Sequence, residues 1–291
     1  MAPPLEPPVA VVTGATGGIG RWIALGLARE GYHVVVIGRD RARGEAAQNW
    51  IARKAPQADT SLIIADLSLL AATRSAGEII AARHKQIKLL VNNAGIFDAA
   101  PVTTEEGHER VLATNLLSPF VLTQTLLPSL RAGAPSRIIT VGSSTSDRAR
   151  IDPDRLVLGR RWTMVRAYGQ SKLAVMMMTF ALAKELEGTG VVANVVHPGL
   201  VASGLVKTPG MIGFVWRCLA PFALSEEEGA DTPLIAALAP AFANVSGAYI
   251  KNGRIVSPNR RALDPALVAR VWSATQRLAA AGESPATASQ M

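Results

Sequence analysis

The sequence predicts an α/β fold with a doubly wound parallel sheet in a single domain. Short runs of Val, Ile and Leu recur without an alternating polar face, which is typical of strands buried on both faces. Amphipathic segments of helical length lie between these runs. Strands that alternate with helices pair in parallel through crossover helices, and ligands of such sheets bind beyond the carboxyl ends of the strands.

Six strands and five long helices are predicted in this way. The strands are Val9–Thr13, His33–Gly38, Ser61–Asp66, Lys88–Asn93, Arg137–Gly142 and Val191–His197. The helices are Gly20–Glu30, Arg41–Lys54, Leu70–His84, Glu105–Leu127 and Thr163–Glu187. No segment between them resembles a linker, so we expect one domain over residues 9–280. The proline-rich residues 1–8 and the small-residue stretch 281–291 are expected to be flexible tails.

Composition limits the possible functions. Of the 291 residues, 49% are hydrophobic and 18% are charged, which is enough apolar material for a full core. Cys218 is the single cysteine, so an intramolecular disulfide and a cysteine metal cluster are excluded, and a reducing, cytoplasmic location is expected. We expect no metal site. We expect no apolar run that reaches the ~18–20 residues that a membrane span needs, and no signal peptide is recognised.

The net charge is +8, and the arginines are scattered rather than arranged in a stripe with aromatic residues. Nucleic-acid binding is therefore not predicted. Attraction of a polyanionic small molecule explains part of the basicity with fewer assumptions.

The first predicted strand runs directly into the glycine-rich stretch TGATGGIG, with Gly14, Gly18 and Gly20 before a helix. Glycines let the backbone approach a pyrophosphate, which the free N–H groups and the positive dipole of a helix start stabilise. A tight turn without a ligand is the alternative. The position after the first buried strand favours a dinucleotide site in a Rossmann-type fold.

The end of the second predicted strand indicates which dinucleotide binds. Gly38 occupies the position where an acidic residue would bind the adenosine ribose of NAD, and Arg39 follows it. A guanidinium can bind a 2′-phosphate through paired hydrogen bonds. We therefore expect NADP, with NADPH preferred over NADH. In the alternative interpretation, Arg39 is an ordinary surface arginine and Asp40 binds the ribose.

The stretch YGQSK places Tyr168 and Lys172 four positions apart, on one face of a predicted helix. Such a pair is more often a solvated helix surface than an active site. Reduction of a carbonyl by hydride, however, needs a proton donor at the oxygen. A phenol, with a pKa near 10, becomes a better donor and acceptor when nearby cations stabilise its phenolate.

These motifs, taken together, resemble the short-chain dehydrogenase/reductase family of the one-domain type. The chain has TGATGGIG, then Asp66, NNAG over Asn92–Gly95, Asn115, Ser143, YGQSK and HPGLVAS, in the order of the family. The resemblance covers nearly the whole chain.

The resemblance implies roles for the matching residues. Tyr168 is the general acid and base, Lys172 tunes it and binds the nicotinamide ribose, Ser143 orients the carbonyl, and Asn115 holds a water. Ser144 is the nearby competitor of Ser143. The implied cofactor-binding residues are Thr13, Gly14, Thr16, Gly18, Ile19, Gly20, Arg39, Asp66, Leu67, Asn93, Ala94, Gly95, Tyr168, Lys172, Pro198, Gly199, Val201 and Ser203.

Two segments resemble the retinol-dehydrogenase-like branch of the family, which acts on bulky apolar carbonyls or alcohols. Ser143 and Tyr168 lie 25 positions apart, which is long for the family. The apolar stretch Met211–Phe222 falls in a lid expected at about residues 204–224. This stretch could line an apolar pocket, form a subunit contact or, least favoured, lie on a membrane surface.

Family members commonly form homodimers or homotetramers through the two long helices, here Glu105–Leu127 and Thr163–Glu187, although core packing explains many of the same apolar side chains. The leading functional hypothesis is an NADP(H)-dependent carbonyl/alcohol oxidoreductase acting on an apolar small molecule. A catalytically silent NADP(H)-binding regulator is the alternative. A sugar-nucleotide epimerase needs a larger C-terminal domain than the residues after Pro198 provide.

Overall fold

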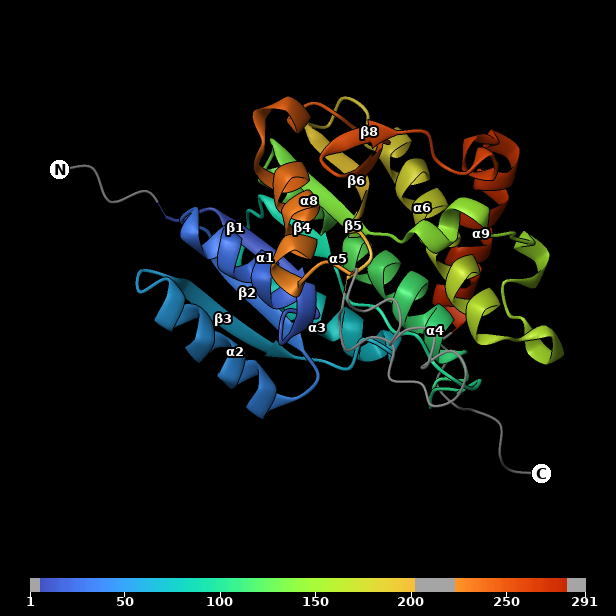
Figure 1. The fold of residues 1–291 in the computed structure, drawn as a ribbon, viewed down its shortest axis with the longest axis horizontal. Coiled ribbons are helices and arrows are strands. Elements are labelled where there is room, and N and C mark those ends of the chain that lie inside the picture. Colours follow the sequence, from blue (N-terminus) through green and yellow to red (C-terminus); the bar gives the residue numbers. More distant parts are fainter. Residues whose placement is uncertain (1–5, 202–222, 282–291) are drawn as a thin grey trace.

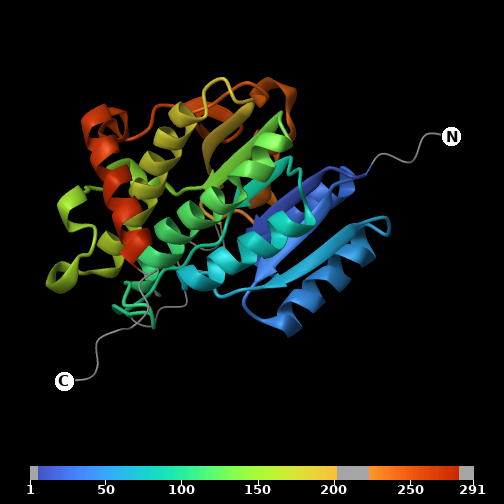
Figure 2. The ribbon, with the colours of Figure 1, turned by 180° about the vertical axis from the view of Figure 1, so that it is seen from behind.

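The computed structural model describes residues 6–201 and 223–281, which form one eight-stranded sheet with helices on both faces (Figures 1 and 2). The strand order is β3-β2-β1-β4-β5-β6-β7-β8. Strands β1 to β7 pair in parallel, and β8 pairs with β7 in the antiparallel direction. The strands are β1 (Val9–Thr13), β2 (His33–Gly38), β3 (Asp59–Ile64), β4 (Leu89–Asn92), β5 (Ser136–Val141), β6 (Val191–His197), β7 (Tyr249–Lys251) and β8 (Arg254–Val256).

The doubly wound fold predicted from the sequence is confirmed, and all six predicted strands are present. The largest difference is at the sheet edge, where β3 begins at Asp59 and ends at Ile64 rather than at Asp66. The β7–β8 hairpin was not predicted. Its turn has Asn252 at φ 51° and Gly253 at φ 67°, the positive angles that a two-residue Asn-Gly hairpin turn requires.

Alternate residues of the central strands point to opposite helical layers. Ala10 and Val12 of β1 pack with α1 (Gly18–Arg29) and α8 (Glu226–Leu238). Val11 packs on the other face with α3 (Leu70–Arg83), α5 (Ser118–Ala132) and α6 (Met164–Glu185). Helices α1 and α8 lie in front of the sheet in Figure 1, and α3, α5 and α6 are in front in Figure 2. Helix α2 (Arg41–Lys54) lies beside β3.

The predicted helix Glu105–Leu127 begins later and is not regular. It starts as the short α4 (Arg110–Leu112), widens into a π-helical segment, Ala113–Leu117, and continues as α5. The whole segment Arg110–Ala132 is long and apolar enough to cross a membrane, so the expectation that no segment has this length is wrong. Because 78% of its most apolar window is buried inside the molecule, it serves as a core helix of this fold.

The last helix, α9 (Pro265–Ala281), packs against α6 and α5 (Figure 2). Trp272 of α9 meets Phe120 of α5 edge to face, with ring centroids 5.3 Å apart. Met176 and Met177 of α6 are fully buried in the same cluster. The helix surface expected to form a subunit contact is thus largely covered by the chain itself. Self-association stays a prediction and needs another surface.

Some predictions concern residues outside the described ones. Ser203, the apolar stretch Met211–Phe222 and all but the last two positions of the expected lid, 204–224, are among them. At the two ends, the Pro8 carbonyl accepts a hydrogen bond from the His33 N–H, and α9 extends to Ala281. Pro8 and Ala281 thus take part in the described fold, and the domain bounds 9–280 stay a prediction.

Candidate active site

A cleft of about 670 Å³ lies at the carboxyl ends of β1, β2, β4 and β5, where the strand order reverses. This is the position at which doubly wound sheets bind ligands. The cleft brings together most of the predicted cofactor-binding residues, namely Gly14, Thr16, Gly18, Ile19, Gly20, Arg39, Asp66, Leu67, Asn93, Ala94, Gly95, Tyr168, Lys172 and Pro198. Thr13, Asn115, Ser143, Gly199 and Val201 lie outside its lining.

The glycine-rich turn has the backbone that a pyrophosphate needs. Gly14 and Gly18 have φ angles of 64° and 57°, in the left-handed region that favours glycine. At Gly20 a Cβ atom would lie 2.4 Å from both the Gly14 carbonyl oxygen and the Asn93 side-chain nitrogen. No side chain caps α1 and no acidic residue lies in its first turn. The first N–H groups of α1 are therefore available to an anion.

Thr13 supports this turn rather than lining the cleft. Its hydroxyl accepts hydrogen bonds from the N–H groups of Asn93 and Ala94, each at 2.9 Å. The Asn93 amide nitrogen donates in return to the Thr13 carbonyl at 2.9 Å. These bonds join the carboxyl ends of β1 and β4, and so hold the glycine-rich turn beside the NNAG segment.

The end of β2 has no space for an acidic side chain at Gly38, and two arginines line the cleft nearby. A Cβ atom on Gly38 would lie 2.2 Å from the Thr16 methyl group, which leaves no room for a carboxylate at that position. Arg39 and Arg43 both line the cleft. One carboxylate oxygen of Asp40 caps α2 by accepting from the Arg43 N–H at 2.8 Å. Arg43 was missed because its position inside α2 belongs to no motif.

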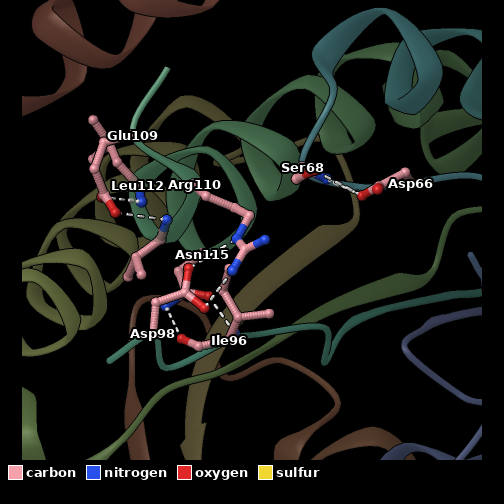
Figure 3. Close-up of polar contacts among 9 residues, drawn as sticks. Asp66, Ser68, Ile96, Asp98, Glu109, Arg110, Leu112 and Asn115 are labelled. Atoms are coloured by element: carbon pink, nitrogen blue, oxygen red, sulfur yellow. Dashed lines mark hydrogen bonds and ion pairs between the residues drawn. The ribbon is translucent and has the colours of Figure 1, made fainter. Parts of the chain in front are cut away.

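Asp66 and Arg110, both drawn in Figure 3, also line the cleft and lie close enough to interact electrostatically. One Asp66 oxygen accepts from the N–H and hydroxyl of Ser68, at 2.9 and 2.8 Å. Arg110 forms a two-point ion pair with Asp98, with N–O distances of 2.8 and 2.9 Å. This hydrogen bonding to Asp98 raises the pKa of Arg110. Arg110 and Asp98 were not predicted.

Thr114 also lines the cleft and was missed by sequence reasoning. Its side chain is buried, and its hydroxyl has no hydrogen-bond partner among the described residues. Buried hydroxyls normally have a partner. A polar group without one, in the wall of a cleft whose turn accommodates a pyrophosphate, fits a site that holds a dinucleotide. Thr114 immediately precedes Asn115, so its place in the chain was the available signal.

Tyr168 and Lys172 point into the cleft from one face of α6, and both are buried. The ring of Phe97 packs edge to face against Tyr168, with centroids 4.8 Å apart. Burial raises the pKa of Tyr168 to about 12, and a hydrogen bond with Ser143 opposes this shift. Burial also lowers the pKa of Lys172 to about 8. The Lys172 ammonium donates to the Val141 carbonyl at 2.9 Å and lies 5.8 Å from the Tyr168 ring centroid.

Ser143, rather than its competitor Ser144, is the side chain that opposes the burial-raised pKa of Tyr168. It follows β5 and caps the 3₁₀ turn Ser144–Arg148. The Ser143 oxygen accepts from the Thr145 hydroxyl at 3.1 Å and from the Thr145 N–H at 3.3 Å. Its own proton is therefore free to be donated, which is the role predicted for it toward a carbonyl oxygen.

Asn115 lies in the π-helical segment, and its side chain is fully hydrogen bonded. Its amide donates to the Ile96 carbonyl and the Ser171 hydroxyl, both at 3.0 Å, and its oxygen accepts from the Ile96 N–H at 2.8 Å (Figure 3). A Cβ atom on Gly95 would lie 3.2 Å from the Lys172 nitrogen and 3.4 Å from the Asn115 oxygen. Asn115 is thus beside Lys172, and its role in proton transfer stays a prediction.

The segment that carries Ser143 is fixed by residues from the end of the chain. Asp147 accepts a hydrogen bond from the Tyr249 hydroxyl at 3.1 Å and lies 3.7 Å from the Lys251 ammonium. The Asn259 amide donates to the carbonyls of Ser146 and Ala149, at 2.8 and 3.0 Å. No motif predicted this support, because its partners lie more than a hundred positions apart.

The segment after β6 is only partly in the cleft. Pro198 lines it, whereas Gly199 packs against Leu224, and Val201 packs against α8. A Cβ on Gly199 would lie 2.5 Å from Leu224, and Val201 lies against Gly229. His197 is buried, which lowers its pKa to about 4, so the neutral form predominates at pH 7, consistent with the packing role expected from the sequence.

Comparison with known proteins assigns this fold and site to a family. Residues 8–210 match the family model of the short chain dehydrogenases, and the chain belongs to that family. Human dehydrogenase/reductase SDR family member 13 is 38% identical over 94% of this chain and 73% of that protein. Human retinol dehydrogenase 12 is 35% identical, over 93% and 85%. Mouse polyprenol dehydrogenase is 37% identical, over 96% and 87%. The chain therefore has retinol-dehydrogenase-like relatives, as predicted.

Solved structures show the same fold. A protein of Mycobacterium paratuberculosis described as uncharacterized superposes with a TM-score of 0.76 at 29% identity, over 94% of this chain and 96% of that one. A short chain dehydrogenase from Burkholderia cenocepacia, solved in complex with NADP, gives a TM-score of 0.68 at 26% identity, over 83% and 94%.

Proposed function

We propose that this protein is an NADP(H)-dependent oxidoreductase that interconverts a carbonyl and an alcohol, with Tyr168 as the general acid and base. The observation that carries the proposal is the buried Tyr168 in the cleft, one helical turn from Lys172 and near enough to Ser143 for that side chain to lower its pKa. NADP(H), when bound, supplies or accepts the hydride. The family and its oxidoreductase relatives support the same reaction class.

Each residue has one step in this reaction. The Tyr168 hydroxyl donates its proton to the oxygen of the carbonyl in reduction, and takes it back in oxidation. Ser143 donates a hydrogen bond to the same oxygen as negative charge develops there. Lys172 holds a positive charge near the phenol, which favours the phenolate, and Asn115 fixes the Ile96 segment beside it.

NADP is the proposed cofactor, and NADPH is the proposed reductant. Arg39 and Arg43 place two guanidinium groups in the cleft wall at the end of β2, where Gly38 and Thr16 leave no space for an acidic side chain. The NADP complex of the related Burkholderia protein is consistent with this choice. We further propose an apolar small-molecule substrate, in keeping with relatives named for retinol and polyprenol. We also propose a cytoplasmic location, which the single cysteine supports.

Replacement of the phenol tests the catalytic assignment. Tyr168→Phe keeps the ring and removes the proton, so we expect kcat to fall by roughly 10²–10⁴-fold while NADPH affinity changes little. The measurement is NADPH absorbance with a panel of long-chain and isoprenoid aldehydes, ketones and alcohols. Tyr32→Phe is the matched control, because Tyr32 packs against α1 outside the cleft.

Turnover of Tyr168→Phe within threefold of the unmodified protein would show that the assignment is wrong. Tight NADPH binding with no turnover of any compound would favour the regulator.

A further inference from the structure

A second cavity, of about 610 Å³, lies beside the catalytic residues. Its walls come from the segment after Ser143 and from the first turns of α6, namely Ser144, Thr145, Arg148, Ala149, Arg150, Val165, Arg166, Gly169 and Gln170. Gly142 lines the cofactor cleft and Ser144 lines this cavity, so Ser143 lies between the two. Tyr168 lies in the first cleft, and its neighbour Gly169 lines the second.

Three arginines surround this cavity, and no carboxylate balances them. Arg148, Arg150 and Arg166 are exposed, and their guanidinium groups have no ion pair or hydrogen bond to any described residue. An arginine-lined cavity without carboxylates favours a bound anion, because the guanidinium group matches phosphate and carboxylate geometry.

The nearby carboxylates are paired with other cations. Asp147 lies 3.7 Å from the Lys251 ammonium and accepts from Tyr249. Asp152 lies 4.0 Å from Arg155, and Asp154 pairs with Arg270. Each acidic residue of the segment between Ser143 and Tyr168 therefore has a partner outside the cavity, and the positive charge of the three lining arginines stays available.

The remaining walls are apolar or already hydrogen bonded. Ala149, Val165 and Gly169 contribute apolar surface, and Val165 is 62% exposed. The Gln170 amide donates to the Leu156 carbonyl at 2.8 Å, and the Thr145 hydroxyl donates to Ser143. A ligand of this cavity would thus meet both apolar surface and cationic side chains.

We propose that this cavity binds the anionic group of an amphiphilic substrate, a phosphate or carboxylate carried on an apolar chain whose carbonyl or alcohol reaches Ser143 and Tyr168. The proposal rests on the proposed function and narrows it: the apolar substrate also carries an anionic group. The cofactor cleft lies on one side of Ser143. The three arginines lie on the other side, where they select substrates that carry an anionic group.

The first test compares a long-chain aldehyde that ends in a carboxylate with the methyl ester of the same aldehyde. We expect kcat/KM to favour the carboxylate by about tenfold or more, since charge-assisted hydrogen bonds to guanidinium groups are the strong ones. The triple variant R148Q/R150Q/R166Q should lose this preference. The matched control R160Q/R161Q/R254Q removes three exposed arginines outside the cavity lining and should keep it. Equal use of both aldehydes by the unmodified protein overturns the proposal while leaving the oxidoreductase function intact.

The second test measures binding without turnover. Dodecyl phosphate, below its micelle concentration and with NADP⁺ present, should bind the unmodified protein and the control variant but not R148Q/R150Q/R166Q in calorimetry. Vesicles of phosphatidylcholine and phosphatidylglycerol separate the two sources of an anion: binding to vesicles with no binding of free dodecyl phosphate assigns the arginines to a lipid surface and overturns the substrate proposal. The protein could also bind dodecyl phosphate through these arginines and yet reduce no aldehyde. That result would support the anion site and contradict only the proposed function.

Discussion

The two sides of the active site are built in different ways. On the cofactor side, backbone groups meet at close range: Thr13 and Asn93 join β1 to β4, and Gly20 leaves no room for a Cβ atom. On the substrate side, Ser143 is on a 3₁₀ turn that is held by long side chains, Tyr249 and Asn259, from the end of the chain.

This difference follows from what each side binds. A dinucleotide has the same pyrophosphate and ribose in every related enzyme, so glycines and backbone N–H groups suffice to hold it. Substrates differ between relatives, and connections can change without disturbing the sheet. We therefore expect substitutions on the cofactor side to affect binding and stability together, and substitutions on the substrate side to affect turnover more than stability.

The largest effect is expected from Gly20→Ala. A methyl group at this position would collide with the Gly14 carbonyl and the Asn93 amide, so we expect the free energy of unfolding to fall by roughly 1–3 kcal/mol. NADPH affinity should fall with it, as measured by fluorescence titration. The matched variant on the substrate side is Gly169→Ala, where a Cβ would meet its nearest atom at an ordinary 3.5 Å.

Gly169→Ala, in the interior of α6, should leave the free energy of unfolding unchanged or raise it by about 0.5–1 kcal/mol. Urea unfolding of both variants gives the comparison. If Gly20→Ala is as stable as Gly169→Ala and binds NADPH normally, the close packing of the cofactor side has no energetic consequence and the contrast between the two sides fails.

The sequence could predict the cofactor side because its signals are local. The glycines at 14, 18 and 20 follow a buried strand directly, and Tyr168 and Lys172 are one helical turn apart. Arg43 and Arg110 could not be found in this way, since each lines the cleft only through the tertiary placement of α2 or α4, whereas Thr114 had only its position beside Asn115 as a signal. The cover of α9 over α5 and α6 was missed for the same reason.

Cofactor choice is the next largest effect. Arg39→Glu places a carboxylate near the expected 2′-phosphate and so replaces charge-assisted hydrogen bonds by repulsion. The preference for NADPH over NADH should therefore fall by roughly 10–100-fold. The matched control is Arg41→Glu. Arg41 is exposed, lies 3.8 Å from Glu45 and does not line the cleft. The measurement is kcat/KM for each cofactor, and an unchanged ratio in Arg39→Glu would remove the argument for NADP.

Lys172 joins the two sides, and its burial predicts a pH dependence of stability. Because burial lowers the pKa of Lys172 to about 8, the unfolded chain holds more protons than the folded protein between pH 8 and the ordinary lysine pKa near 10.5. Stability should therefore rise with pH across this window. In urea unfolding without added cofactor, we expect the unmodified protein to gain roughly 1–2 kcal/mol relative to Lys172→Met between pH 7.5 and 9.5.

The control for this effect is Lys184→Met on the same helix, where the lysine is exposed. This variant should follow the unmodified protein at both pH values. The upper limit of pH 9.5 avoids titration of Tyr168, whose pKa is raised to about 12 by burial. A difference between the unmodified protein and Lys172→Met that is constant with pH would contradict the burial of a titrating ammonium.

The smallest effect is expected where the substrate side is held from a distance. Tyr249→Phe removes the hydroxyl that donates to Asp147 at 3.1 Å, while Lys251 stays near the same carboxylate. The 3₁₀ turn should lose one of its supports, so we expect kcat to fall by about threefold to tenfold, the range of one ordinary hydrogen bond. NADPH affinity should stay within twofold, because Tyr249 does not line the cofactor cleft.

Asp147→Asn and the double variant show whether Tyr249 acts through the turn. If the two side chains position Ser143 together, the loss of kcat in the double variant should be smaller than the product of the single losses. Tyr32→Phe removes a phenol outside the cleft, at the amino end of β2, and should leave kcat unchanged. A loss of NADPH affinity in Tyr249→Phe equal to its loss of kcat would show that the two sides are coupled, because a support of Ser143 alone changes turnover without changing cofactor binding.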